Sequence, residues 1–210
     1  MTSPAAAERA LLCELFLAVG PDAPTLSGEW TTRDLAAHLV VRERRPDAGP
    51  GIVTGVLAEY SERVRLAEAE RPYDEIVDRV RRGPPRWSPM RVDAVDRLVN
   101  TIEFFVHHED VRRGGATFTP RNLEPALDEA LASLIVPAGK LLTRKSTVGI
   151  VLAPNGHAAT TIHRGEPTVA IGGPIGECVL FLYGRAAASA AELDGPADAV
   201  SELRATALGI

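Results

Sequence analysis

TIEFFVHHEDVRR, residues 101–113, places one glutamate, two histidines and a further pair of acidic residues in a run whose apolar side chains are typical of a packed helix. Glu103 and His107 are four positions apart, so on a helix their side chains project from the same face and can bind one ion between them. Two ligands are too few for a metal site. Another part of the chain must therefore supply a third.

A second helix is predicted for WTTRDLAAHLVVRERR, residues 30–45, which begins with a threonine N-cap and has Asp34 in its first turn. His38 lies on the apolar stripe of this helix and is the candidate for the third ligand. If the two helices are neighbours in a bundle, His38, Glu103 and His107 converge in its core. Two histidines and one carboxylate suit zinc, nickel, iron or manganese, and three protein ligands leave one coordination position open for water or a substrate atom.

The same three residues also have an interpretation without a metal. Glu103 can face solvent, His107 can be a core histidine with its hydrogen bonds satisfied, and His38 can be a helix-packing residue. Alternatively, the three can form a buried hydrogen-bond network with no ion, in which case apolar replacements should leave the stability equal or better.

Other polar residues of these two segments are interpreted from their positions. His108 points about 100° away from His107 on a helix, which predicts a surface residue or a hydrogen-bond partner of a ligand. Asp110 can orient the imidazole of His107 or serve as an ion-pair partner. The run at residues 42–45 is predicted to be a solvated face rather than a substrate funnel, and Trp30 a packing anchor rather than a cofactor platform.

Composition and charge limit the class of protein. The chain has 210 residues, of which 45% are hydrophobic and 24% are charged, and this composition is typical of a folded globular protein. A formal net charge of −5 argues against non-specific binding of nucleic acid. Neither a membrane span nor a secretion signal is recognised, so a cytoplasmic location is expected. Cys13 and Cys178 are expected to be buried free thiols.

Helical periodicity dominates the first half of the chain. It is found over residues 5–19, 31–45, 52–69, 73–82 and 92–113, with Gly/Pro-rich loops between several of these segments. Four of these helices are long and amphipathic, which predicts a four-helix bundle.

The second half predicts a small α+β domain. A helix is expected over 124–142 and is followed by three β-branched runs between residues 146 and 174, with a turn at Asn155-Gly156. A helix, a short extended piece and a final helix over 196–207 complete the chain. We therefore predict an α+β fold with a helical metal-binding domain over 1–115 and an α+β domain with an antiparallel sheet over 120–210.

WTTRDLAAHL and EFFVHHEDVRR resemble the paired signature of the mycothiol-dependent maleylpyruvate isomerase superfamily, the actinobacterial branch of the DinB-like four-helix metal proteins. The resemblance implies that His38, Glu103 and His107 bind a divalent metal, usually zinc. It also implies a C-terminal domain related to sterol-carrier-type folds, because the segments CVLFLYGR and AELDG resemble that domain. Mycothiol, a small-molecule thiol, is the implied cofactor, and its sulfur would take the open metal position as a thiolate.

The resemblance further implies a role for Arg185, the arginine of YGR, as a catalytic residue that binds a substrate carboxylate. The alternative is a cation placed favourably at a helix C-terminus. The segments ERRPDAGPGIVTG and GPPRWSPM resemble a separate subgroup described only as metal-binding proteins, so the specific isomerisation is not implied.

The function expected from the sequence is thus a thiol transferase or isomerase that acts on an electrophilic substrate through a metal-bound thiolate. The alternative is a non-catalytic metal- or ligand-binding module with a stress or regulatory role. A monomer or a homodimer is expected.

Overall fold

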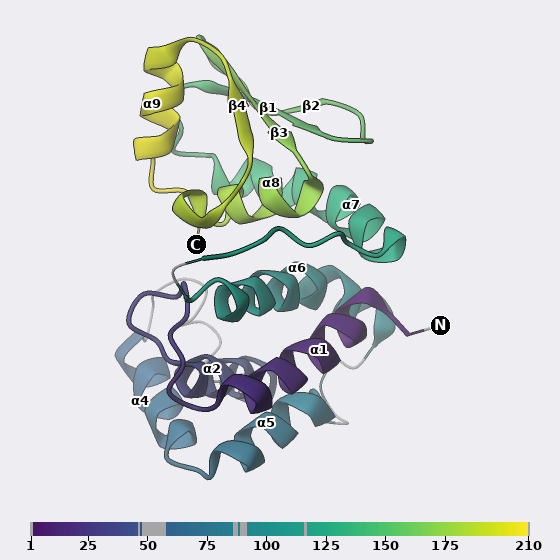
Figure 1. Ribbon diagram of the computed structural model, residues 1–210, viewed down its shortest axis with the longest axis vertical. Coiled ribbons are helices and arrows are strands. Elements are labelled where there is room, and N and C mark those ends of the chain that lie inside the picture. Colours follow the sequence, from purple (N-terminus) through teal and green to yellow (C-terminus); the bar gives the residue numbers. More distant parts are fainter. Residues whose placement is uncertain are drawn as a thin grey trace. The chain divides into compact units, whose positions relative to one another are not determined.

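The computed structural model describes residues 2–45, 47, 58–85, 88, 92–115 and 117–209, without the side chains of 93–95. The chain divides into two compact units, Met1–Phe118 and Thr119–Ile210. Figure 1 shows that the first unit is helical and that the second combines helices with a sheet. An α+β fold is therefore confirmed.

The described part of the N-terminal unit contains five helices. They are α1 (Pro4–Val19), α2 (Thr32–Arg44), α4 (Ala58–Ala69), α5 (Tyr73–Arg82) and α6 (Asp93–Arg112). Each lies where helical periodicity predicts one, although residues 52–57 of the predicted 52–69 helix are outside the described part. Because α5 also packs against α1 and α2, the four-helix bundle stays an interpretation.

Local signals explain where the first two helices begin. Ser3 caps α1 by accepting a hydrogen bond from the backbone of Ala6. Thr31 and Asp34 form a capping box at the start of α2, in which each side chain accepts from the backbone of the other. Tertiary packing then fixes the helices around a fully buried core drawn from α1, α2, α5 and α6. This core includes Leu12, Phe16, Leu35, Leu39, Ile76, Val77, Val80 and Phe104.

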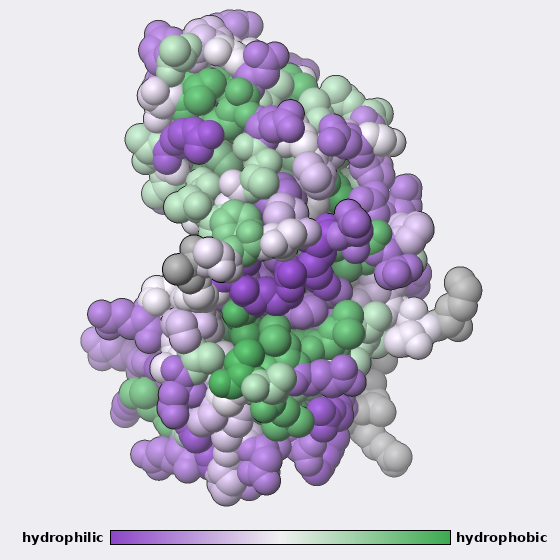
Figure 2. Space-filling model, viewed as in Figure 1, coloured by the Kyte–Doolittle hydropathy of each residue, from purple (hydrophilic) through white to green (hydrophobic). Residues whose placement is uncertain are grey.

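One face of α1 remains apolar at the surface of its unit. Leu11 and Leu17 on this helix are 46% and 48% exposed. Figure 2 shows the apolar side chains gathered over this helix. An exposed apolar patch often marks a contact surface.

The C-terminal unit is built on a four-stranded sheet. In chain order its elements are α7 (Pro125–Leu142), β1 (Gly149–Pro154), β2 (Thr160–His163), β3 (Thr168–Gly173), α8 (Ile175–Leu182), η2 (Ala186–Ala188), β4 (Glu192–Asp194) and α9 (Ala197–Ala205). The strand order is β2-β1-β3-β4. Within this unit α8 packs against α7 and β3, and α9 packs against β3.

The prediction of an antiparallel sheet was wrong, because the sheet is mixed. β1 pairs with β2 in the antiparallel sense, as the turn signal indicates, but β3 lies on the other side of β1 and runs parallel to it. The link from β2 to β3 therefore crosses the start of β1. A Cβ atom on Gly149 would lie 2.1 Å from the carbonyl oxygen of Gly165, so two glycines permit this close approach.

Both cysteines are buried free thiols, as expected. Burial raises the pKa of Cys13 to about 11 and that of Cys178 to about 12. Neither sulfur is therefore a thiolate at neutral pH. In the described part of the chain, no helix has the length and apolar character needed to cross a membrane.

Candidate metal centre

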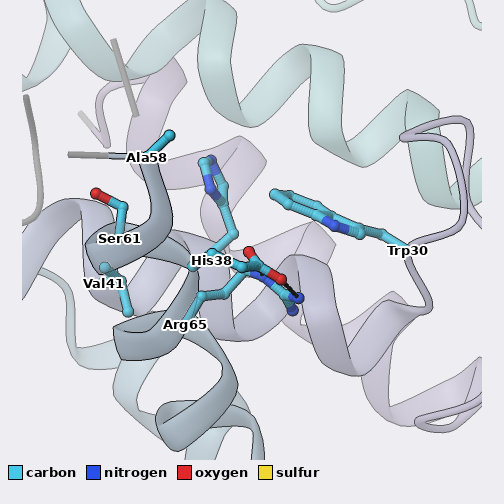
Figure 3. Close-up of a pocket in the computed structure, with 7 residues that line it drawn as sticks. Trp30, His38, Val41, Ala58, Ser61 and Arg65 are labelled. Atoms are coloured by element: carbon cyan, nitrogen blue, oxygen red, sulfur yellow. Dashed lines mark hydrogen bonds and ion pairs between the residues drawn. The ribbon is translucent and has the colours of Figure 1, made fainter. Parts of the chain in front are cut away.

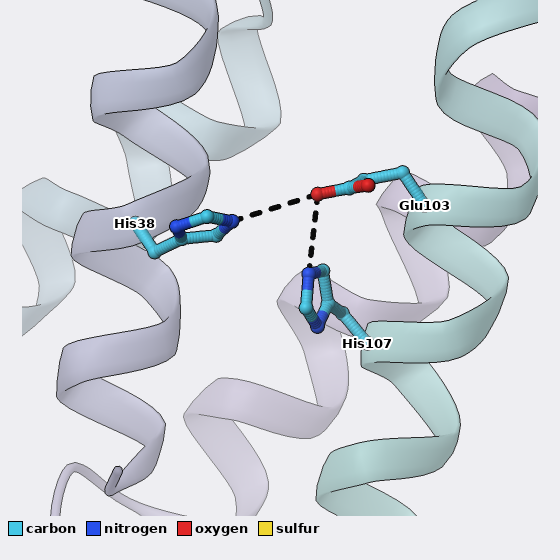
Figure 4. Close-up of side chains that lie close together, drawn as sticks. All are labelled: His38, Glu103 and His107. Atoms are coloured by element: carbon cyan, nitrogen blue, oxygen red, sulfur yellow. Dashed lines mark hydrogen bonds and ion pairs between the residues drawn. The ribbon is translucent and has the colours of Figure 1, made fainter. Parts of the chain in front are cut away.

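Three side chains from two helices meet inside the N-terminal unit (Figure 4). His38 comes from α2, and Glu103 and His107 come from successive turns of α6. Oε1 of Glu103 lies 3.2 Å from Nε2 of His107 and 3.5 Å from Nε2 of His38. One ligand atom from each of the three residues lies within 4.8 Å of the other two. The structure thus brings together the three residues that the sequence singled out.

The donor set fits a small divalent cation. Ligand atoms about 2.0–2.2 Å from a tetrahedral ion are roughly 3.3–3.6 Å apart. The two separations from Oε1, 3.2 and 3.5 Å, are close to this spacing. All three ligand atoms lie within 4.8 Å of one another, so His38, Glu103 and His107 could bind one ion if the two imidazoles adjust their separation, and three ligands would leave a fourth position for a smaller molecule.

The second ring nitrogen of His107, Nδ1, contacts a buried carboxylate. This nitrogen lies 2.9 Å from Oδ2 of Asp110, which is fully buried and also accepts a hydrogen bond from Ser27 Oγ at 2.9 Å. This contact fits both interpretations of Asp110, because the carboxylate can orient the ring of His107 and forms an ion pair with it when the ring is protonated. Burial alone would lower the pKa of His107, but hydrogen bonds to Asp110 and Glu103 raise it to about 9. Because metals bind neutral imidazole, an ion at this site must displace that proton.

The pKa values of Glu103 and His38 are shifted by other causes. Burial alone would raise the pKa of Glu103, but the positive charge of Arg42 and the hydrogen bonds to both histidines hold it well below its usual range. Burial lowers the pKa of His38, and its hydrogen bond to Glu103 only partly opposes this effect. At neutral pH the site therefore holds an ionised carboxylate and a neutral imidazole, both in the form that binds metal.

Arg42 is one of the residues whose place at the site sequence reasoning missed. Its Nε lies 3.1 Å from Oε1 of Glu103, and its other nitrogens donate to the side chain of Asn100 and the carbonyl of Val99. The predicted solvated face at residues 42–45 was wrong for this position, since the Arg42 side chain is only 13% exposed. Position 42 is four residues after His38, and this spacing is the signal that could have identified it.

Two further members of the 42–45 run also depart from that prediction. Glu43 is buried and forms an ion pair with Arg9, at 2.5 Å from Nη2 to Oε1. Arg44 donates to the carbonyl of Gly83. Arg45 alone matches the prediction, because its side chain is 45% exposed. α2 is therefore surrounded by protein over most of its last turn.

A pocket of about 230 Å³ opens beside His38 (Figure 3). Its walls come from α2, α4 and the segment before α2, and they include Trp30, Val41, Ser61 and Arg65. The Trp30 and His38 ring centroids are 5.2 Å apart. Trp30 also packs against the apolar core, as predicted, but in addition it forms a wall of this pocket.

Two other residues weighed in the sequence have hydrogen-bond partners outside the three candidate ligands. His108 is buried rather than exposed, and its Nδ1 lies 2.9 Å from Oε2 of Glu8. Arg185 belongs to the C-terminal unit, where its Nη1 donates to the carbonyl of Tyr183 at 2.6 Å. Its role as a substrate ligand stays a prediction.

The fold and the three convergent side chains define a class of two-unit α+β proteins with a His–Glu–His cluster in the helical unit. No family model matches the sequence, and no curated protein sequence matches it. Two solved structures are similar over nearly the whole chain. The crystal structure of the mycothiol-dependent maleylpyruvate isomerase aligns over 92% of this chain and 96% of that chain, with a TM-score of 0.61 and 16% sequence identity. A mutant of that enzyme with a histidine replaced by alanine aligns over the same shares, with a TM-score of 0.62 and 16% identity. The predicted resemblance is thus confirmed as a likeness of fold.

Proposed function

We propose that this chain binds a divalent metal ion, with zinc the first candidate, through His38, Glu103 and His107. The observation that carries the proposal is the convergence of two imidazole nitrogens on one carboxylate oxygen, at 3.2 and 3.5 Å. Asp110 behind His107 adds support, because imidazoles that bind metals usually donate their other N–H to such an acceptor. Nickel, iron or manganese would suit the same ligands.

We further propose that the protein is a thiol-dependent transferase or isomerase located in the cytoplasm. A bound divalent cation would stabilise a coordinated thiolate at neutral pH. The nucleophilic sulfur must come from a small molecule, because Cys13 and Cys178 are buried with raised pKa values. The two structures with the same fold are described as mycothiol-dependent, which makes mycothiol the first thiol to test.

The protein's own residues then have distinct roles in this proposal. His107 is oriented by Asp110, and Glu103 is kept ionised by Arg42. His38 stays neutral, and it belongs both to the three proposed ligands and to the lining of the pocket. Arg185 is proposed to bind a carboxylate of the electrophilic substrate.

One observation favours a second candidate, a hydrogen-bond network without an ion. Arg42 already supplies a positive charge 3.1 Å from Oε1 of Glu103, so the carboxylate is compensated without a metal. In that case the pocket would serve a non-catalytic ligand-binding module. Metal content separates the two candidates.

The test is metal analysis of protein purified without an affinity tag, before and after zinc titration. We expect about one equivalent of bound zinc in the wild type and loss of tight binding in His107→Ala. His163→Ala is the matched control, because His163 lies on β2 of the other unit. A folded wild-type protein that takes up no transition metal would exclude the proposed centre.

Activity is tested separately, by thiol transfer from mycothiol to a small electrophile. Transfer should require added metal and should disappear in His107→Ala while circular dichroism stays unchanged. Metal binding without any such transfer would support the non-catalytic alternative.

A further inference from the structure

We infer that the pocket between α2 and α4 binds the apolar, non-anionic end of the ligand and disfavours carboxylates. The inference rests on the proposed function in one respect, since it takes the ligand to reach the three candidate metal ligands past His38. The chemistry of the pocket is argued independently of any metal.

The pocket has the size and walls for a compact apolar group. Its volume of about 230 Å³ equals the room taken by roughly eight water molecules, at about 30 Å³ each. The Trp30 and His38 rings form two walls, and Val41 and Ala58 add aliphatic surface. Such a site suits a single ring or a short branched chain.

Arg65 is the one cation among the described residues that line the pocket. Its guanidinium already forms hydrogen bonds with two carboxylates. Its Nη1 lies 2.6 Å from Oδ1 of Asp34. Its Nε and Nη2 lie 2.8 and 2.5 Å from the two oxygens of Glu62. The guanidinium lies over the Trp30 ring, with Cζ 4.8 Å from the ring centroid.

This arrangement leaves no free positive charge among the described residues that line the pocket. One guanidinium faces two carboxylates, so the cluster of Arg65, Asp34 and Glu62 has a net charge of −1. The Glu62 side chain is 47% exposed, whereas that of Arg65 is only 7% exposed. An incoming anion therefore meets a carboxylate and not a free guanidinium.

Release of Arg65 to bind an anionic ligand would be costly. It would break a two-point ion pair with Glu62 and a third hydrogen bond to Asp34, and charge-assisted bonds of this kind are the strong ones. Asp34 cannot follow the arginine, because the backbone and hydroxyl of Thr31 hold its other oxygen at 3.0 and 2.7 Å. The pocket therefore favours an aromatic or aliphatic group that carries a positive charge or none. A carboxylate elsewhere on the ligand needs a partner other than Arg65.

The test uses three probes of nearly equal shape on the full-length protein: benzylammonium, benzyl alcohol and benzoate. A chelator is included so that no metal can bind the carboxylate, and affinities are measured by NMR titration. We expect benzylammonium and benzyl alcohol to bind at least about tenfold more tightly than benzoate. Filling the pocket with Ala58→Leu should abolish binding of both.

The charge argument is tested by Glu62→Gln. This change removes one negative charge and one partner of Arg65, so the preference for benzylammonium over benzoate should fall about fivefold or more. Glu59→Gln is the matched control, because it removes the same charge from an exposed residue of the same helix that is not among the described lining residues, and it should change the preference less than twofold.

Three results would overturn the inference: benzoate binding as tightly as benzylammonium, none of the three probes binding, or Glu62→Gln leaving the preference unchanged. A parallel zinc titration of the same samples without chelator reports on the proposed metal centre. Failure of the one measurement is therefore distinguishable from failure of the other.

Discussion

At the scale of single residues, Oε1 of Glu103 lies close to three nitrogen-bearing side chains. His38, His107 and Arg42 all place a nitrogen within 3.5 Å of it. A guanidinium beside a metal ligand both orients the carboxylate and repels a cation. Arg42 and a metal ion therefore supply positive charge to the same carboxylate.

Arg42→Met tests this competition. Without a metal, the variant should be less stable than the wild type by about 2–3 kcal/mol, because partly buried polar groups lose a charged partner. Zinc should then raise the melting temperature of the variant more than that of the wild type, because the ion replaces the missing charge. Arg45→Met, at an exposed position of the same segment, should respond to zinc as the wild type does. A smaller zinc response in Arg42→Met would contradict this account.

Asp110→Asn tests the orientation of His107. An amide cannot stabilise the imidazole as a carboxylate does, and the loss of such an acceptor typically weakens metal binding about tenfold or more. Zinc affinity measured by competition with a chromophoric chelator should fall accordingly. Ser27→Ala removes only a hydrogen bond to the same carboxylate and should have a smaller effect. Equal zinc affinities of Asp110→Asn and the wild type would show that Asp110 does not support metal binding by His107.

The convergence of the three candidate ligands was predicted from the sequence more completely than the residues around them. Glu103 and His107 share a helix, so their spacing alone places them on one face, and His38 was identified by its place on an apolar stripe. The i, i+4 spacing places Arg42 on the same face of α2 as His38, but how far Arg42 is buried depends on the packing of α2 against other helices. Arg65 was missed for the same reason, since its partner Asp34 is 31 positions away.

At the scale of elements, α2 is the helix that joins the core, the candidate metal centre and the pocket. It contributes His38, and it is tied to α4 by the ion pair between Asp34 and Arg65. Its capping box and its apolar stripe were both readable in the sequence. The pairing of strands was not, because the turn at Asn155-Gly156 determines only the partner of β1 on one side.

Asp34→Ala tests the tie between α2 and α4. Burial alone would raise the pKa of Asp34, but hydrogen bonds from Thr31 and Arg65 outweigh burial and lower it. Its stabilising contribution is therefore full above the unfolded-state pKa of about 3.9 and is lost as the pH falls through the lower folded-state value.

Urea unfolding should accordingly show a loss of about 1–2 kcal/mol for Asp34→Ala at pH 7. The difference from the wild type should shrink below about pH 4. Asp22→Ala removes an exposed aspartate and should show no such pH dependence. A deficit of equal size at pH 7 and pH 3 would mean that the carboxylate charge is not what stabilises the helix.

At the scale of the whole molecule, all three candidate ligands lie within the N-terminal unit. Any stabilisation by metal should therefore be local to that unit. The change from helical periodicity to β-branched runs led to the prediction of a helical first half and an α+β second half of the chain. The sequence could not show that the link into β3 crosses β1, because that depends on contacts between segments.

Hydrogen exchange of the full chain, with and without zinc, tests this locality. Amides of α2 and α6 should exchange more slowly when zinc is bound, because a ligand stabilises the state that binds it. Amides of β1 and β3 should be unchanged within error and serve as the internal control. Uniform protection of both units would contradict the assignment of the site to the N-terminal unit alone.

The most direct test of the central claim is zinc X-ray absorption of the loaded full-length protein. The account predicts scattering from two imidazoles and one carboxylate oxygen at about 2.0–2.2 Å, and the loss of one imidazole in His107→Ala. A wild-type spectrum without imidazole scattering, or one identical to that of His107→Ala, would show that His38, Glu103 and His107 do not bind the ion.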